Sequence, residues 1–353
     1  MHKRNLLSTA LIVPALFALE VFGGSPIYSP QEGATLTKRF ESTAEITLDD
    51  MTMVVNGQDM SGMLNLEMDT SATIVTQVTD HYAAVSSGRP AKLERTFDTL
   101  SSKTHVSSTN PMTGDMDVDM EGSSDLEGES VVFQWNDDDG AYAVKYAEGS
   151  DGDSDLLEGL DEDMDLELFL PSETVSEGDE WEVSPNAMRA VFAPGGATGI
   201  EAEENAANMG MGGTGPSNFG EFLEDFDGAI TAKFKEVREE GDTHVAVIEL
   251  SVECSSAADM TEWMQDMLEN ADMPEGMDVE MTVDSFDLEF SFEGEGELLW
   301  DLDENLPFGL NLSGDVEQAI DTSMVINAGG MEQAMEQSMS FSGTQTIQMT
   351  TGE

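Results

Sequence analysis

Strict alternation of apolar and polar residues between positions 226 and 254 most limits what this chain can fold into. Ile230, Ala232 and Phe234 alternate with polar residues, and the same pattern resumes after a turn at Gly241. A period of two puts apolar side chains on one face of a strand and polar ones on the other. The short Gly-containing connection suits a hairpin. The segment therefore predicts two antiparallel strands with one buried face.

The same alternation recurs in both halves of the chain, including residues 36–55, 64–85 and 286–302. Asn56-Gly57 is a strong turn signal after the first of these runs. Antiparallel sheets with one dry and one wet face produce this alternation. We expect a mainly β protein, α+β only to a minor degree, built on a long antiparallel curved sheet or open half-barrel.

One amphipathic helix is predicted over residues 259–271. Met260, Trp263 and Met264 begin an apolar series that recurs at three and four residues. Asp259 stands where a side chain caps the first turn. The helix is expected to cover or line part of the sheet.

Composition excludes several classes of function. The chain has 353 residues, with 73 acidic and 13 basic side chains and a formal charge of −60. Binding of double-stranded nucleic acid needs clustered Lys and Arg, and docking on an anionic membrane needs positive charge as well. The charge indicates high solubility, attraction of cations or a saline setting. Hydrophobic residues make up 39% of the chain, which is enough for a folded core.

Residues 1–24 are predicted to be an export signal. A positive start at Lys3 and Arg4 precedes an apolar run from Leu6 to Phe22, followed by small residues at Gly23 and Gly24. We therefore expect export to the periplasm or the exterior and no stable membrane insertion after cleavage. An uncleaved anchor is the alternative. The single cysteine, Cys254, excludes an intramolecular disulfide, and a small buried hydrophobe is favoured over a reactive thiol.

The mature chain is predicted to have two β regions. Residues 25–193 form an N-terminal antiparallel β region with acidic loops, including a loop over 110–129 and a buried strand over 166–170. For the alternating acids at 115, 117, 119 and 121, the solvated face of a strand is the alternative. Residues 194–218 are rich in Gly and form a linker or loop. Residues 219–353 form a C-terminal β region that contains the 259–271 helix.

The acidic side chains are compatible with two kinds of site, a calcium site and a catalytic carboxylate pair. Asp151, Asp153, Asp155 and Glu162 match the carboxylate spacing of a calcium loop, although Leu156 occupies the position where such a loop needs Gly. Loose divalent binding and a solvated charge run are the alternatives. A carboxylate pair acting as a hydrolase depends on spacing that only the fold can set. Calcium is thus the one cofactor expectation.

Other catalytic patterns are missing from the sequence, so no catalytic residue is assigned. The histidines are scattered, and there is no H-E-x-x-H, G-x-S-x-G, P-loop or dinucleotide-binding fingerprint after a strand. Trp263, Met264, Met267 and Trp300 lie on apolar faces. Core packing is their plain interpretation, and the walls of an apolar pocket are the alternative.

Three stretches, residues 169–181, 228–252 and 294–314, resemble a family of uncharacterised exported β-sheet proteins. The family is a domain of unknown function found in planctomycetes and related bacteria. The motifs are Phe169-Leu170-Pro171, Gly178-Asp179-Glu180-Trp181 and Trp300-Asp301. The resemblance implies a bowl-like antiparallel sheet, distantly similar in shape to periplasmic lipoprotein carriers. It implies no activity and no site residues.

The resulting expectation is an exported, non-catalytic binding or carrier module for an apolar ligand or a cell-envelope partner. One alternative is a structural or divalent-cation-binding acidic envelope protein. A hydrolase that uses a carboxylate pair is the second alternative. Nucleic acid is not an expected partner.

Overall fold

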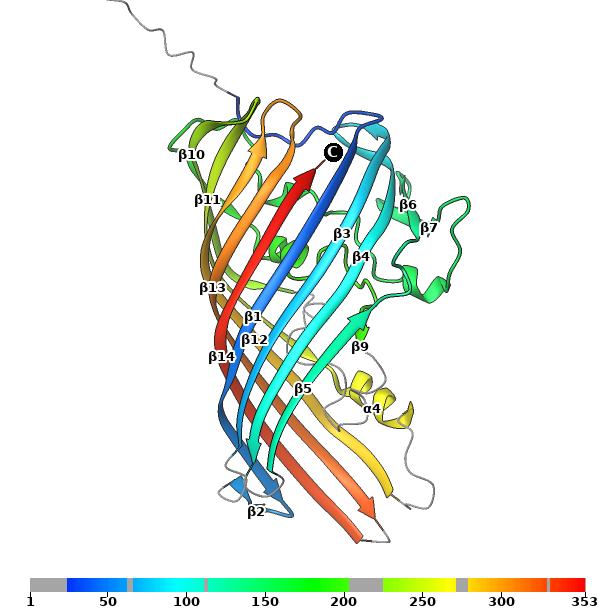
Figure 1. The fold of residues 1–353 in the computed structure, drawn as a ribbon, viewed down its shortest axis with the longest axis vertical. Coiled ribbons are helices and arrows are strands. Elements are labelled where there is room, and N and C mark those ends of the chain that lie inside the picture. The colour runs from blue at the N-terminus through cyan, green and yellow to red at the C-terminus, as the bar shows by residue number, and fades with distance from the viewer. Residues whose placement is uncertain are drawn as a thin grey trace, which may run out of the picture.

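The computed structural model describes residues 24–61, 66–110, 114–202, 225–270, 279–328 and 331–352, so the predicted export signal lies almost wholly outside the described residues. The strands are β1 (Thr35–Val55), β2 (Gln58–Asp59), β3 (Glu67–Ser86), β4 (Arg89–Asn110), β5 (Gly114–Ser123), β6 (Ser130–Asn136), β7 (Ala141–Tyr146), β8 (Glu180–Val183), β9 (Glu201–Ala202), β10 (Asp227–Glu240), β11 (Thr243–Asp259), β12 (Val279–Asp301), β13 (Leu306–Ala328) and β14 (Met331–Gly352). They form one curved antiparallel sheet (Figure 1).

The strand order shows an open sheet, which confirms the predicted fold class. It runs β7-β6-β4-β3-β1-β14-β13-β12-β11-β10-β8, with β2 beside β1, β5 beside β4, and β9 beside β5. The two ends of this path, β7 and β8, do not pair with each other within the described residues. Because β1 pairs with β14, both predicted β regions belong to the same sheet.

The predicted hairpin is present as β10 and β11, which turn at Gly241 with a positive φ of 67°. Ile230, Ala232 and Phe234 are buried, and so are the alternating apolar residues of β11. A register shift between Phe234 and Glu236 lets β10 bend without losing its partner. The alternation therefore marks the faces of the sheet correctly on both sides of the turn.

A segment between β7 and β10 covers the concave face of the sheet (Figure 1). Its helical turns are η1 (Ser154–Leu157), η2 (Glu167–Phe169), η3 (Pro185–Met188) and α2 (Arg189–Phe192). Met164, Leu166 and Phe169 are buried in the same cluster as the inward side chains of the strands. The Phe192 ring lies 5.0 Å from the Phe290 ring, measured between centroids. Each fully buried side chain of this size stabilises the fold by about 1.5–3 kcal/mol.

The convex face is polar along the central strands. In β13, exposed Ser313, Asp315 and Glu317 alternate with buried Leu312 and Val316. The sheet thus places water on one side and the core on the other, as alternation requires. Among the described residues, no helix has the length and hydropathy to cross a membrane.

The predicted helix is α4 (Thr261–Asn270), which covers one edge of β12. Asp259 caps it, since its Oδ1 atom accepts hydrogen bonds from the Thr261 backbone N at 3.0 Å and from the Thr261 hydroxyl at 2.6 Å. The Thr261 hydroxyl in turn accepts a bond from the Phe286 backbone N at 3.0 Å. The helix therefore satisfies backbone groups at the β12 edge beyond the end of β11, which protects that edge from other chains.

Two local expectations are wrong. Residues 114–123, expected in a loop, form β5, because each pairs with β4 while its apolar residues face inward. Residues 166–170, expected as a strand, contain the single helical turn η2. A short apolar run does not distinguish a strand from a buried turn. In the predicted linker, the Ala197 backbone N donates to the Gly159 carbonyl at 3.0 Å, so its first part packs against the acidic segment. Residues 203–218 lie outside the described residues.

Candidate functional site

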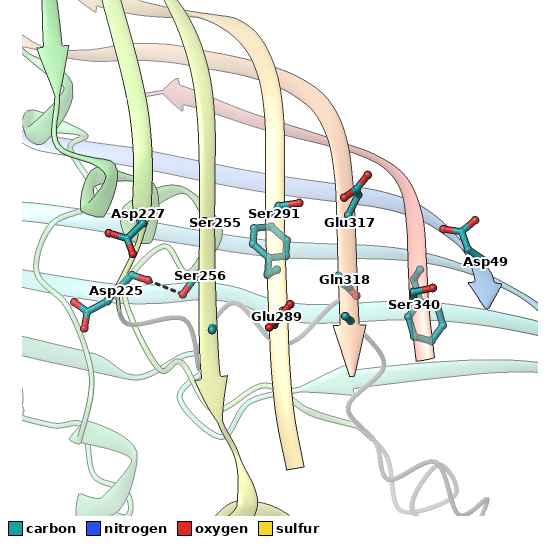
Figure 2. A pocket seen from close by; sticks show the side chains of 14 residues that line it. Asp49, Asp225, Asp227, Ser255, Ser256, Glu289, Ser291, Glu317, Gln318 and Ser340 are labelled. Atoms are coloured by element: carbon teal, nitrogen blue, oxygen red, sulfur yellow. Dashed lines mark hydrogen bonds between the residues drawn. The ribbon is translucent and has the colours of Figure 1, made fainter. Parts of the chain in front are cut away.

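A pocket of about 710 Å³ lies on the sheet at the start of β10 and extends across β11, β12, β13 and β14 to β1 (Figure 2). In three of these strands the lining residues are consecutive triplets, namely 255–257, 289–291 and 317–319. The middle residue of each triplet is buried, with exposed fractions of 6–7% for Ser256, Phe290 and Gln318. Successive side chains of a strand point to opposite faces. The lining, called the groove below, therefore includes exposed side chains of the outer face and buried side chains of the inner face.

Strand register arranges the flanking residues in two rows that run across the strands. The first, here called the Asp227 row, joins Asp227, Ser255, Ser291 and Glu317 as successive cross-strand partners. The second, called the Glu289 row, joins Ala257, Glu289, Ala319 and Ser340, and then Asp50 of β1 beside Asp49. The register shift at Asp49 makes it the extra residue of a bulge. Small side chains separate the acidic ones within each row.

Every charged residue that lines the groove in the described part of the chain is acidic. They are Asp49, Asp225, Asp227, Glu289 and Glu317. The Asp225 carbonyl accepts a hydrogen bond from the Ser256 hydroxyl at 2.6 Å, which fixes the chain where it enters β10. Nowhere in the described part of the chain are three or more His, Cys, Asp or Glu side chains placed to hold a metal ion. The groove therefore presents separate carboxylates to a ligand rather than one coordination site.

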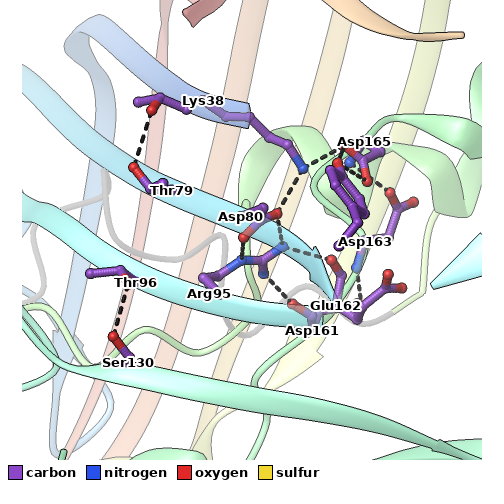
Figure 3. A network of polar contacts seen from close by, with 12 residues as sticks. Lys38, Thr79, Asp80, Arg95, Thr96, Ser130, Asp161, Glu162, Asp163 and Asp165 are labelled. Atoms are coloured by element: carbon purple, nitrogen blue, oxygen red, sulfur yellow. Dashed lines mark hydrogen bonds and ion pairs between the residues drawn. The ribbon is translucent and has the colours of Figure 1, made fainter. Parts of the chain in front are cut away.

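A second cluster of charged residues lies inside the sheet (Figure 3). Lys38 of β1 contacts Asp80 of β3 at 2.8 Å and also contacts Asp165. Arg95 of β4 donates from Nε and Nη2 to the two carboxylate oxygens of Asp80 at 2.7 and 2.8 Å. All four side chains are at most 2% exposed. The two positive and two negative charges balance, as buried ions require.

The cluster fastens the concave-side segment to the sheet. Arg95 donates to the backbone carbonyls of Asp161 and Glu162, each at 2.8 Å. Tyr28 and Tyr82 donate their hydroxyl protons to Asp165, both at 2.7 Å. These contacts join β1, β3, β4, the segment over 161–165 and the chain before β1. We assign the cluster a structural role, because all its charges contact neighbours within the protein.

The environment of the cluster shifts several pKa values. Burial alone would raise the pKa of Asp80, but the charges of Arg95 and Lys38 lower it to about 2. Burial, reinforced by the charge of Asp165, raises the pKa of Glu162 to about 9 and that of Asp163 to about 7. The Asp163 Oδ1 atom accepts hydrogen bonds from the backbone of Asp165 and Leu166, whereas its buried Oδ2 atom has no hydrogen-bond partner among the described residues. The charged form of Asp163 therefore lowers the stability of the folded protein, because part of the carboxylate is buried without a partner.

The expected calcium ligands are not brought together. Asp151, Asp153 and Asp155 are exposed, and the Asp153 carboxylate accepts a hydrogen bond from the Asp155 backbone N at 3.1 Å as the cap of η1. Glu162 lies farther along the segment, beside the Arg95 guanidinium. This spacing therefore builds a capped helical turn and not a ring of oxygen ligands.

The expected apolar pocket residues lie in or against the core. Trp300 is fully buried and donates from Nε1 to the Ile27 carbonyl at 3.0 Å. Trp263 and Met264 are half-buried against β12, and the Trp263 ring lies 6.2 Å from the Phe286 ring. The side chain of Met267 lies outside the described residues. None of the other three lines the groove, and an apolar pocket beside α4 stays a prediction.

Sequence reasoning missed both the groove and the buried cluster. The groove depends on register across six strands, which no local pattern shows. The buried cluster did leave a signal, because Lys38, Asp80 and Arg95 each occupy an inward position of an alternating strand. Their neighbours two residues away on the same face are apolar, as Val78 and Tyr82 are for Asp80. A charged residue at such a position needs a buried partner.

Comparison with known proteins yields only weak similarities. No protein-family model and no curated protein matches the chain. The outer membrane protein OprG from Pseudomonas aeruginosa is similar with 10% identity and a TM-score of 0.21, over 91% of this chain and 98% of that one. An outer membrane channel from Pseudomonas putida F1 is similar with 8% identity and a TM-score of 0.20, over 91% and 97%. TM-scores this low do not establish a shared fold, so nothing known of these proteins is carried over.

Proposed function

We propose that the protein is an exported, non-catalytic binding protein that holds a cationic ligand or envelope partner in the groove. One observation carries the proposal: among the described residues that line the groove there are five carboxylates and no basic side chain. Its volume of about 710 Å³ lies within the range of ligand sites. A positive ligand is the class that such a surface attracts.

The exposure of the groove carboxylates supports a role in binding rather than a role in stabilising the fold. Asp49, Glu289 and Glu317 are exposed and make no ion pair among the contacts of the described residues. Carboxylates gathered around one groove repel each other, so they oppose folding slightly unless a cation occupies it. The charge of −60 strengthens the field at the groove and speeds the approach of a positive ligand.

Calorimetric titration with octalysine at low salt tests this function. We expect saturable binding that weakens as salt is added, because exposed ion pairs are screened. The triple variant Asp49→Asn, Glu289→Gln and Glu317→Gln should bind about tenfold more weakly, since each exposed pair contributes roughly 0.2–1 kcal/mol.

A second triple variant controls for the loss of net charge alone. Glu148→Gln, Glu239→Gln and Asp242→Asn make the same charge change at exposed positions outside the groove. Octalysine should bind this variant within about twofold of the wild type, because distant exposed charges are screened. Equal weakening in both variants, or no binding at all, would overturn the proposal.

A further inference from the structure

Three methionines are neighbours on the inner face of the sheet, where the end of β1 pairs with β14. Met51 of β1 is the direct cross-strand partner of Met339 of β14. Met53 lies two residues farther along β1, opposite Gln337. Direct partners have Cβ atoms about 4.5–5.5 Å apart, and diagonal neighbours lie about 7–8 Å apart, which is within reach of long side chains. The three flexible side chains can therefore meet over one point of the sheet.

The bulge at Asp49 brings both β1 methionines to this face. Before the bulge, buried Leu48 marks the even-numbered residues as the inward set. The extra residue reverses this parity, so that Met51 and Met53 turn inward. Their burial agrees, because both methionines are half-buried whereas Thr52 between them is exposed. An uninterrupted strand would have turned both methionines toward the outer face.

A hydrogen bond draws the Met339 sulfur toward Met53. The Nε2 atom of Gln337 donates to the Sδ atom of Met339 at 3.1 Å. Because Gln337 is the direct partner of Met53, this contact places the sulfur beside the second methionine of β1. Met339 is also half-buried, in contrast to Met349 farther along β14, which is packed in the core with 1% exposure. The three side chains thus remain accessible to a small ion.

The surroundings favour a soft positive ion. Neither β14 nor residues 40–60 contain Lys or Arg. Asp50 and Glu336 are exposed on the outer face of the same strands, and their charge attracts cations to this part of the sheet. Among cations, thioether sulfur selects Cu(I), whereas hard ions such as calcium and magnesium prefer oxygen.

We propose that Met51, Met53 and Met339 bind one Cu(I) ion through their sulfur atoms. The site is independent of the proposed function, because its ligands are neutral sulfur atoms and not the carboxylates of the groove. A thioether has no proton to lose, so the affinity is the same at about pH 5 and about pH 8, unlike that of a thiolate or imidazole site.

Competition with the chelator bicinchoninate, followed by absorbance under anaerobic reducing conditions, tests the site. The wild-type protein should withdraw one Cu(I) ion per chain from the coloured complex, equally at both pH values. The triple variant Met51→Leu, Met53→Leu and Met339→Leu should leave the ion with the chelator. Such volume-conserving changes cost less than about 1.5 kcal/mol each, and urea denaturation checks that the variant is folded.

The single variant Met53→Leu removes one ligand with the least disturbance of packing. It should weaken Cu(I) binding at least about tenfold, since even the partners of metal ligands contribute that much. Unchanged affinity in this variant and in the triple variant would overturn the inference.

Matched controls separate a defined site from a general affinity of methionine or thiol for copper. A second triple variant changes half-buried methionines whose cross-strand partners are Ser108, Thr104 and Ile326, namely Met116→Leu, Met120→Leu and Met281→Leu. This variant and Cys254→Ala, which removes the buried thiol, should both bind Cu(I) as the wild type does. Loss of binding in either control, or affinity that rises with pH, would overturn the inference and leave the binding of octalysine unaffected.

Discussion

On the inner face of the sheet, Lys38, Asp80 and Arg95 are fully buried and each charge contacts an opposite one. On the outer face, Glu289 and Glu317 are exposed, and the charged residues that line the groove are all acidic among those the structure describes. The two clusters belong to neighbouring parts of one sheet, since β1 contributes Lys38 to the first and Asp49 to the second.

In this fold, buried charges that are paired within the protein hold its elements together, whereas exposed charges remain available to bind a ligand. A buried ion loses its hydration, so it is retained only beside a partner inside the protein. An exposed carboxylate keeps its water and costs little, so it remains available to a ligand. Changes to the inner cluster should therefore alter stability, whereas changes to the groove should alter binding.

The largest expected effect comes from Arg95→Met. The substitution removes the guanidinium from Asp80 and leaves the carbonyls of Asp161 and Glu162 without its donors. Breaking a buried pair in this way costs about 3–5 kcal/mol of unfolding free energy, measured by urea denaturation. Lys103→Met, which removes an exposed contact of 3.1 Å with Glu121, should cost less than about 1 kcal/mol. Similar costs for the two variants would contradict the division between the faces.

A smaller effect, dependent on pH, is expected for Asp163→Asn. Asparagine keeps an oxygen to accept the bonds from the Asp165 and Leu166 backbone and carries no charge at the buried Oδ2 position. In the wild type, burial raises the pKa of Asp163 from 3.8 to about 7. The stability linked to its proton is therefore complete below about pH 4 and is lost as the pH rises to about 7.

The variant should accordingly be more stable than the wild type at pH 8, by about 1–3 kcal/mol, and no more stable at pH 4. Unfolding by guanidinium chloride at the two pH values measures the difference. Asp242→Asn at the exposed β10–β11 turn is the matched control and should show no such gain. A gain for Asp163→Asn that is the same at both pH values would show that burial of its charge is not the cause.

The sequence predicts an element when its pattern is visible within that one strand or helix. The alternation in β10 and β11 predicted both strands and their buried faces, because a period of two is visible within one strand. The β5 strand was only the alternative interpretation, since its Gly and Asp residues are typical of loops and its pairing with β4 is not local. The sequence predicted the helix and its cap at Asp259. It did not predict that Thr261 and Gln265 accept hydrogen bonds from the β12 backbone.

The two sites were harder to predict than the strands, because each brings together residues that are distant in the sequence. Alternation puts Glu289 and Glu317 on the outer face, yet only the register of β12 with β13 places them in opposite rows. Asp49 lies in a bulge of β1 that no residue pattern predicts. The inner cluster was the more predictable of the two, because Lys38 and Arg95 interrupt the apolar set of their strands and imply a buried carboxylate.

The smallest expected effect, and the sharpest test of the outer face, is Ser255→Lys. Ser255 is exposed in the Asp227 row, between Asp227 and Ser291, so a lysine there brings a positive charge to the groove. Binding of octalysine should weaken about fivefold by calorimetry, while the unfolding free energy changes by less than about 0.5 kcal/mol. Ser251→Lys makes the same change on the same exposed face of β11 but outside the groove, and should weaken binding less than twofold. If both lysines weaken binding equally, the protein attracts cations through its overall charge and the groove holds no defined site.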